Sequence, residues 1–190
     1  MAKEIELKAH VSDFSITLEK LRLNKHISNE TFAHKLDVYY FNPLINQSFR
    51  VRQELLKSTD TLISKETILT VKQKSITEGI EQNNEIEVEL PYDNFKDTLT
   101  FFDSMGFNKT IRKSKTGYSF NFNKFEYPLH IELLEVNDLG WFFEIEFVID
   151  ESIDQNIINT LINNLYETLK IFDIPIENIE KRYYSQMINQ

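Results

Sequence analysis

Charged residues recur at every second position along several short segments of the chain. The first of these segments, Glu4-Ile5-Glu6-Leu7-Lys8, alternates two carboxylates and an ammonium group with apolar residues. Because successive side chains of a β-strand point to opposite faces, these three charged groups share one face. Further pairs of one sign stand two residues apart at Arg50/Arg52, Lys72/Lys74, Glu85/Glu87, Lys113/Lys115 and Glu144/Glu146. Clustered carboxylates suit Mg²⁺ or Mn²⁺, and clustered Arg and Lys side chains suit the oxygens of a polyphosphate.

A solvated sheet face is the other explanation of this pattern, and for a single strand it is the commoner one. Like charges two residues apart repel each other, however, and this pattern returns in six segments. Such repetition favours a sheet that is closed into a barrel, with the charges gathered in its interior. Because buried charges are costly unless they are paired or bound to an ion, this interior predicts both a metal and a polyphosphate.

Alternation and turn residues predict the elements that position these groups. About nine strands are expected, near residues 4–10, 36–41, 48–53, 69–74, 84–90, 109–115, 117–123, 129–136 and 141–149. Helices are expected after Ser12, from Pro91 to Gly106, from the capping box 152–155 along the stripe Ile158, Leu161, Leu165 and Leu169, and over 176–188. Their apolar stripes are expected to pack on the apolar side of the sheet.

Length and composition set the class of protein. The chain has 190 residues, a formal net charge of −9 and no cysteine. This length predicts a single domain over 1–190, and the missing cysteines exclude disulfides and thiolate sites. With no signal-peptide-like or membrane-spanning run, a cytoplasmic protein that has no membrane partner is expected. The acidic balance argues against nucleic acid as a partner, and the oligomeric state stays open between monomer and homodimer.

The charged segments follow one another in an order that matches a known set of motifs. The matching segments are Glu4–Lys8 (ExExK), Asp37–Tyr40 (D-x-Y-F), Arg50–Arg52 (R-x-R), Leu69–Lys72 (L-T-x-K), Glu85–Glu87 (E-x-E), Lys113–Lys115 (K-x-R), Leu139–Glu146 (L-G-x-F-x-E-I-E) and Lys181–Tyr184 (K-x-S-Y). In this order the chain resembles the CYTH superfamily, the triphosphate tunnel metalloenzymes, over nearly its whole length. That superfamily includes class IV adenylyl cyclases and thiamine and inorganic triphosphatases.

The resemblance implies a fold and a set of site residues. The fold would be α+β, an eight-stranded antiparallel β-barrel with helices packed on the outside, binding Mg²⁺ or Mn²⁺ and the triphosphate of ATP or another triphosphate. The implied metal ligands are Glu4, Glu6, Glu144 and Glu146, with Glu132 as a further candidate, and Glu85 and Glu87 are further tunnel acids. The implied triphosphate-binding residues are Lys8, Arg50, Arg52, Lys72, Lys74, Lys113, Lys115 and Arg182, and the implied catalytic residues are Glu4, Glu6, Lys8, Glu144 and Glu146.

Three positions depart from the pattern of the family. Leu134 stands where a metal-binding Asp is usual, and Glu132, two residues earlier on the same face, is a candidate substitute. Asn83 stands where an Arg commonly precedes E-x-E. Lys115 replaces an Arg, which loses the bidentate fork of a guanidinium. Metal affinity or substrate choice is therefore expected to differ from the family norm.

Several functional assignments stay open at this point. The first expectation is a class IV adenylyl cyclase that converts ATP to cyclic AMP and pyrophosphate, followed by an inorganic or organic triphosphatase. A non-catalytic polyphosphate-binding module is the third, and Leu134 is the residue that favours it. His10 is a substrate contact, a catalytic base or a structural imidazole, and Trp141 is expected to pack in the core or at its rim in preference to stacking on a nucleobase.

Overall fold

A computed structural model describes residues 2–44, 46–58, 61–77, 79–137 and 139–188. The strands are β1 (Ala2–His10), β2 (Ile27–Asn42), β3 (Gln47–Ser58), β4 (Thr61–Thr77), β5 (Ile80–Pro91), β6 (Asn108–Phe122), β7 (Leu129–Val136) and β8 (Trp141–Asp150). The α-helices are α1 (Phe14–Leu23), α2 (Phe95–Ser104), α3 (Gln155–Ile171) and α4 (Tyr184–Ile188), and two short 3₁₀ helices are η1 (Tyr92–Asn94) and η2 (Ile176–Asn178). None of the helices in these ranges is long and apolar enough to cross a membrane.

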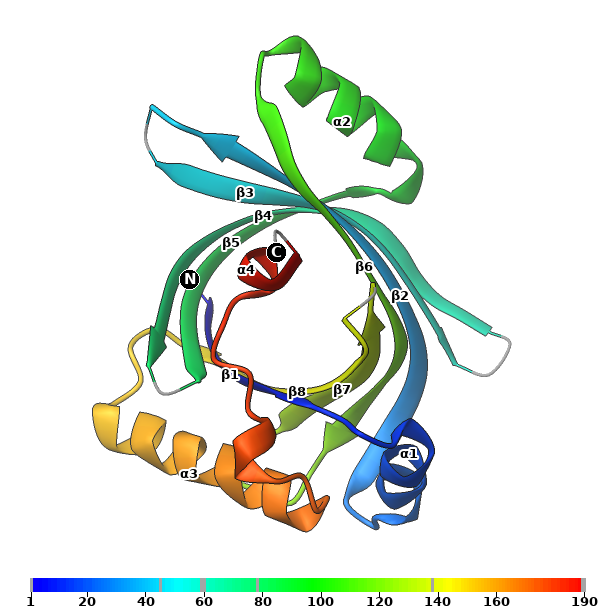
Figure 1. The fold of residues 1–190 in the computed structure, drawn as a ribbon, viewed down its shortest axis with the longest axis vertical. Coiled ribbons are helices and arrows are strands. Elements are labelled where there is room, and N and C mark those ends of the chain that lie inside the picture. Colours follow the sequence, from blue (N-terminus) through cyan, green and yellow to red (C-terminus); the bar gives the residue numbers. More distant parts are fainter. Residues whose placement is uncertain (1, 45, 59–60, 78, 138, 189–190) are drawn as a thin grey trace.

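The eight strands form one closed antiparallel barrel, in the order β1-β5-β4-β3-β2-β6-β7-β8, with β8 pairing back to β1 (Figure 1). The expected α+β barrel with external helices is therefore confirmed. The expectation of nine strands was wrong by one, because the segments predicted at 109–115 and 117–123 form the single strand β6. Gly117 continues the strand, since it pairs with Ala33 on one side and Leu134 on the other.

Apolar residues on the outer barrel face form two cores under the helices. In the larger core, Ile5 and Leu7 of β1 are fully buried, and the whole expected stripe of α3 packs into the same cluster. A smaller core lies under α2, where Phe95 and Leu99 pack on Val51 and its neighbours. Figure 1 shows α1 and α3 on one side of the barrel and α2 on the other. These helices leave the barrel interior to the charged faces of the strands.

The helices begin later than the sequence predicted. Asp13, not Ser12, caps α1, because its carboxylate accepts a hydrogen bond from the backbone N–H of Ile16. Asp154 caps α3 in the same way, while Ser152 bonds instead to Asp150. The residue that was expected to open a helix, Pro91, ends β5, and the 3₁₀ helix η1 precedes α2.

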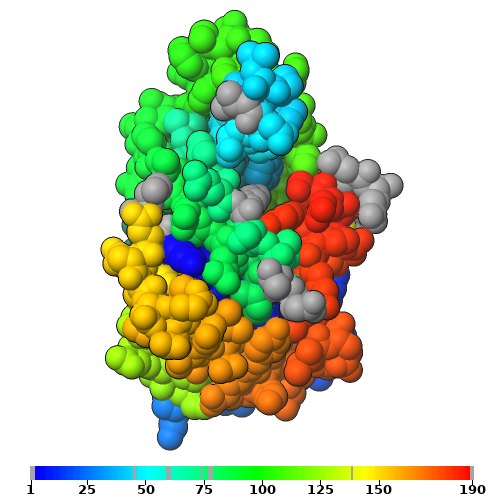
Figure 2. Space-filling view, turned by 90° about the vertical axis from the view of Figure 1, so that its left-hand side faces the viewer, coloured from blue at the N-terminus to red at the C-terminus, as the bar shows by residue number. Residues whose placement is uncertain are grey.

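The predicted helix over 176–188 was also wrong, because this segment splits into η2 and α4 with an extended stretch between them. In that stretch the N–H of Glu180 donates to the carbonyl oxygen of Lys8, and Ile179 bridges to Ala9. The segment thus reaches one end of the barrel, where α4 lies in the opening (Figure 1). On the face shown in Figure 2, this C-terminal segment (red) lies above the end of α3 (yellow to orange).

Candidate functional site

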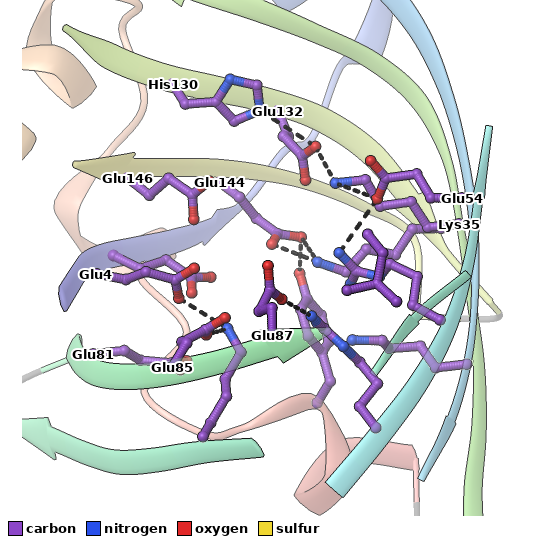
Figure 3. Close-up of a pocket in the computed structure, with 18 of the residues that line it drawn as sticks. Glu4, Lys35, Glu54, Glu81, Glu85, Glu87, His130, Glu132, Glu144 and Glu146 are labelled. Carbon is purple, nitrogen blue, oxygen red and sulfur yellow. Dashed lines mark hydrogen bonds and ion pairs between the residues drawn. The ribbon is translucent and has the colours of Figure 1, made fainter. Parts of the chain in front are cut away.

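The inward faces of the strands enclose a cavity of about 540 Å³, which is within the usual range for a small-molecule site. Acidic side chains from β1, β5 and β8 line one side of it, and basic side chains from β2, β3 and β6 line the other (Figure 3). The alternating charges therefore face the barrel interior, and the interpretation as a solvated sheet face was wrong.

Three of the expected metal ligands meet on the acidic side. Glu4 and Glu6 on β1 and Glu146 on β8 each offer a carboxylate oxygen, and these oxygens lie within 4.8 Å of one another. Burial, and then the charges of Glu81 and Glu144, raise the pKa of Glu6 to about 8. Burial and the neighbouring Glu4 also raise the pKa of Glu146. Carboxylate oxygens are hard ligands that Mg²⁺ and Mn²⁺ prefer, so this group of three fits either ion.

The other two candidate metal ligands are bound to lysines instead. Glu144 accepts hydrogen bonds of 2.7 and 2.5 Å from Nζ of Lys115, and Glu132 pairs with Lys35. Burial disfavours the charged form of both carboxyls, but the charges of the lysines outweigh it. The pKa of Glu144 therefore lies below its ordinary value because of Lys115, and the pKa of Glu132 lies well below because of Lys35. Within the described residues, neither carboxylate joins the group of Glu4, Glu6 and Glu146.

A buried aspartate organises the basic side. Asp37 on β2 is fully buried, and it accepts hydrogen bonds of 2.7 and 3.1 Å from Nε and Nη2 of Arg52. Nζ of Lys113 lies 3.1 Å from the same carboxylate. Burial opposes ionisation, but the charges of Arg52 and Lys113 hold the pKa of Asp37 well below its ordinary value. Asp37 belongs to the D-x-Y-F motif, from which no role was predicted, and in the structure it holds two expected phosphate ligands, Arg52 and Lys113.

Arg50 also lines the basic side of the cavity, together with Arg52 and Lys35. Its Nη2 donates to Oγ1 of Thr70 at 2.8 Å and to Glu87 at 3.3 Å, whereas its Nε has no partner among the described residues. Lys35, which was not predicted from the sequence as a site residue, also lines this side and pairs with Glu132. The alternation along β2 could have found Lys35, since it stands two residues before Asp37.

Two expected phosphate ligands lie against the acidic side. Lys8 is 1% exposed and forms an ion pair with Glu81, a tunnel acid that the sequence analysis missed. Glu81 pairs in register with Glu6 across the β1–β5 ladder. Nζ of Lys72 contacts Glu4 at 2.8 Å and also pairs with Glu85. Another expected ligand, Lys74, has a side chain that lies outside the part of the chain that the structure describes.

The remaining candidates lie near the C-terminal segment or on the outer face. Arg182 binds Glu180 and is not among the described residues that line the cavity. Nε2 of His10 lies 3.1 Å from the same Glu180, and the imidazole ring is 4.5 Å from that of Phe142. Trp141 stacks on Phe14 at the rim of the larger core.

At the end near α4, the barrel interior becomes apolar. Val136, Phe142, Tyr184 and Met187 form a buried cluster there. Leu134 is fully buried and pairs in register with Phe142. Leu134, which replaces the Asp that is usual in the family, thus lies at an apolar end of the tunnel, away from the group of three carboxylates.

Tyr184 connects this apolar end to the charged interior. Its hydroxyl donates a 2.7 Å hydrogen bond to Oε1 of Glu144. The ammonium groups of Lys113 and Lys115 lie 4.7 and 4.8 Å from the centre of its ring. These distances are typical of cation–π contacts. Tyr184 belongs to the expected C-terminal motif, but nothing in the sequence predicted that it would reach the tunnel.

The chain was compared with known protein families and curated proteins. A family model described as the CYTH domain matches residues 2–184. No curated protein is similar enough in sequence to count as a match.

Solved structures share the fold over nearly the whole chain. The PH1819 protein of Pyrococcus horikoshii has a TM-score of 0.69 and 23% identity, with 98% of each chain covered. A Vibrio parahaemolyticus protein named "putative adenylate cyclase" has a TM-score of 0.71 and 14% identity, again with 98% of each chain covered. A Hippeastrum protein named as an adenylyl cyclase, whose description reports a dominant triphosphatase activity, has a TM-score of 0.62 and 16% identity over 99% of this chain and 94% of that chain. At these identities the similarity establishes the fold.

Proposed function

Because the chain belongs to the CYTH family, we propose that it is a metal-dependent enzyme that acts on a triphosphate held in its tunnel. The proposed reaction is the conversion of ATP to cyclic AMP and pyrophosphate, as in a class IV adenylyl cyclase. One observation carries the metal and triphosphate part of this proposal: a group of three carboxylates and a set of anchored cations face each other across a single cavity. The acidic net charge of the chain argues against nucleic acid as the partner, whereas the cations gathered on one side of the cavity support a small triphosphate.

The acidic side of the tunnel would hold the metal. Glu4, Glu6 and Glu146 would bind Mg²⁺ or Mn²⁺. When bound, such an ion supplies charge neutralisation and Lewis acidity for an in-line displacement at phosphorus. Lys72 contacts Glu4 and Glu85, so its ammonium group lies beside a carboxylate that would bind the metal.

The basic side would bind and orient the phosphates. Arg52 and Lys113 are both held by Asp37, so their donors are oriented before a substrate binds. Charge-assisted hydrogen bonds from such donors to phosphate oxygens are stronger than neutral ones. In the cyclase reaction, the ribose 3′-hydroxyl loses its proton to solvent and its oxygen forms a bond to the α-phosphorus, while the bond from that phosphorus to the oxygen shared with the β-phosphate breaks and pyrophosphate leaves. Fixing all three phosphates in one extended arrangement is what makes that in-line geometry reachable.

A triphosphatase is the second candidate function, and one comparison favours it. The description of the Hippeastrum relative reports a dominant triphosphatase activity although that protein is named as an adenylyl cyclase. Hydrolysis needs the same metal ligands and phosphate contacts, with water attacking the terminal phosphorus in place of the ribose oxygen. The two reactions therefore differ in alignment and share their binding residues.

Product analysis separates these functions. Purified protein is incubated with ATP, or with inorganic tripolyphosphate, in Mg²⁺ and in Mn²⁺, and the products are separated by chromatography. Cyclic AMP with pyrophosphate is the expected result. ADP with phosphate, or cleavage of tripolyphosphate with ATP untouched, would instead establish the triphosphatase. Binding of both compounds without any turnover would leave a non-catalytic polyphosphate-binding module.

A further inference from the structure

Asn83 is a neutral amide on β5 between Glu81 and Glu85, two acidic residues that line the tunnel. It is only 1% exposed. Among the residues that the structure describes, neither its Oδ1 nor its Nδ2 has a hydrogen-bond partner. Because an unpartnered buried amide costs free energy, folded proteins keep few of them, and each one needs an explanation.

The position of Asn83 places it next to the group of three carboxylates. It stands directly opposite Glu4 in the β1–β5 ladder and directly opposite Lys74 in the β4–β5 ladder, and the side chain of Lys74 lies outside the described part of the chain. On its own strand it lies between Glu81 and Glu85, whose side chains share its face because they are two residues away. The Cβ atoms of directly opposed strand residues are about 4.5–5.5 Å apart, so the amide lies within reach of a ligand that Glu4 holds.

The charges around Asn83 favour a cation over a phosphate. The carboxyl groups of this side of the tunnel, which we call the acidic wall, belong to Glu4, Glu6, Glu81, Glu85 and Glu146. Among the described side chains, the lysines that pair with them are Lys8 and Lys72. An anion next to Asn83 would be repelled by the excess of carboxylates, whereas a divalent cation would be attracted. An amide oxygen is a neutral ligand that Mg²⁺, Mn²⁺ and Ca²⁺ accept beside carboxylates.

We propose that Asn83 is a metal-binding residue, whose Oδ1 adds a fourth protein oxygen to those of Glu4, Glu6 and Glu146. This inference rests on the metal-dependent part of the proposed function. It also gives a reason for the departure from the family pattern, where an Arg commonly stands in this place. The unpartnered amide oxygen is then explained, because it is partnered only when the cation is bound.

The test is direct Mn²⁺ binding, measured by titration calorimetry on metal-free protein, together with the melting temperature without metal. The variant Asn83→Leu keeps the size of the side chain and removes both polar groups. It should weaken Mn²⁺ binding at least tenfold, while its metal-free melting temperature equals or exceeds that of the wild type. Asn83→Asp should bind Mn²⁺ at least as tightly as the wild type but melt lower without metal, because it adds another carboxylate to the acidic wall. The matched control is Asn84→Leu, on the other face of the same strand, which should bind Mn²⁺ like the wild type.

Unchanged Mn²⁺ affinity in Asn83→Leu would overturn the inference. A lower melting temperature in that variant with unchanged affinity would make Asn83 a structural residue and would overturn it as well. If Asn83→Leu does not fold, Asn83→Asp decides, since a tenfold loss of affinity in that variant contradicts a ligand role. A wild type that binds no Mn²⁺ would overturn the metal-dependent proposed function itself, which is a separate outcome.

Discussion

The phenol of Tyr184 donates a hydrogen bond to Glu144, and this bond joins the C-terminal helix α4 to the wall of the tunnel. The same carboxylate is held from the other side by Lys115. Burial, and then the charge of Glu144, raise the pKa of Tyr184 well above its ordinary value, so the phenol keeps the proton that it donates. A residue four positions before the end of the described chain thus bonds to β8 in the barrel wall.

The first prediction concerns this bond. Tyr184→Phe should lower the free energy of unfolding by about 1.5–3 kcal/mol, the range for a hydrogen bond to a charged group. Urea unfolding of the metal-free protein measures the loss. Tyr166→Phe, on the partly exposed side of α3, is the matched control and should change stability by less than half as much. Equal stability of Tyr184→Phe and wild type would show that the bond does not hold α4 in place.

The second prediction concerns pH. The pKa of Glu6 is raised from 4.5 to about 8, so the folded protein holds this proton more tightly than the unfolded chain does. Unfolding therefore releases a proton between these pH values, and the stability of the metal-free protein should fall as pH rises from about 4.5 to about 8. Above that window the contribution of Glu6 should stay constant. Glu6→Gln cannot titrate, so the fall should be smaller in that variant when urea midpoints at pH 5.5 and 8.5 are compared. The same pH dependence in both proteins would contradict the assignment to Glu6.

The third prediction concerns phosphate binding by the basic side. Arg50→Met should weaken tripolyphosphate binding by about 1.5–3 kcal/mol, because a charge-assisted hydrogen bond is lost. Affinity is measured by calorimetry in the presence of Mg²⁺. Arg22→Met serves as the control, since Arg22 pairs with Glu30 on the outer surface. If both variants bind tripolyphosphate with the affinity of the wild type, Arg50 does not bind the phosphates.

The fourth prediction concerns the acidic wall. Glu146→Gln should abolish turnover while leaving the metal-free protein at least as stable as the wild type, because it removes one of several repelling carboxyl groups. Turnover is measured in both Mg²⁺ and Mn²⁺, and stability by urea unfolding. The control Glu135→Gln changes an exposed carboxylate on the outer face of β7 and should keep full activity. Full activity of Glu146→Gln would remove Glu146 from the metal site.

The strands and their inward faces could be predicted because side-chain alternation is a local property. Glu4 and Glu6 point inward for the same reason that Ile5 and Leu7 point outward. Ion-pair partners depend instead on the register between strands that are far apart in sequence, and closure of the barrel sets that register. The pairing of Lys72 with Glu4, and not with a position on the basic side, follows from it.

The C-terminal segment was the least predictable part for a related reason. Its conformation depends on single long-range contacts, such as the bond from Glu180 to the backbone of Lys8, and it has no periodicity of its own. Local capping was misjudged by one or two residues at α1 and α3, because an Asp closer to each helix competes with the Ser that was chosen. The proposed role of Asn83 could not be predicted from the sequence, since the lack of a hydrogen-bond partner is visible only in the folded structure.

The most direct test of the central claim is an isotope experiment on the reaction itself. ATP is incubated with the protein and Mn²⁺ in H₂¹⁸O, and the products are examined by mass spectrometry. Attack by the ribose 3′-oxygen predicts cyclic AMP and pyrophosphate that both lack ¹⁸O. Phosphate that carries ¹⁸O would mean that water attacks phosphorus, which would contradict the cyclase and leave a triphosphatase. Unchanged ATP, together with unchanged tripolyphosphate in a parallel incubation, would contradict catalysis in this tunnel altogether.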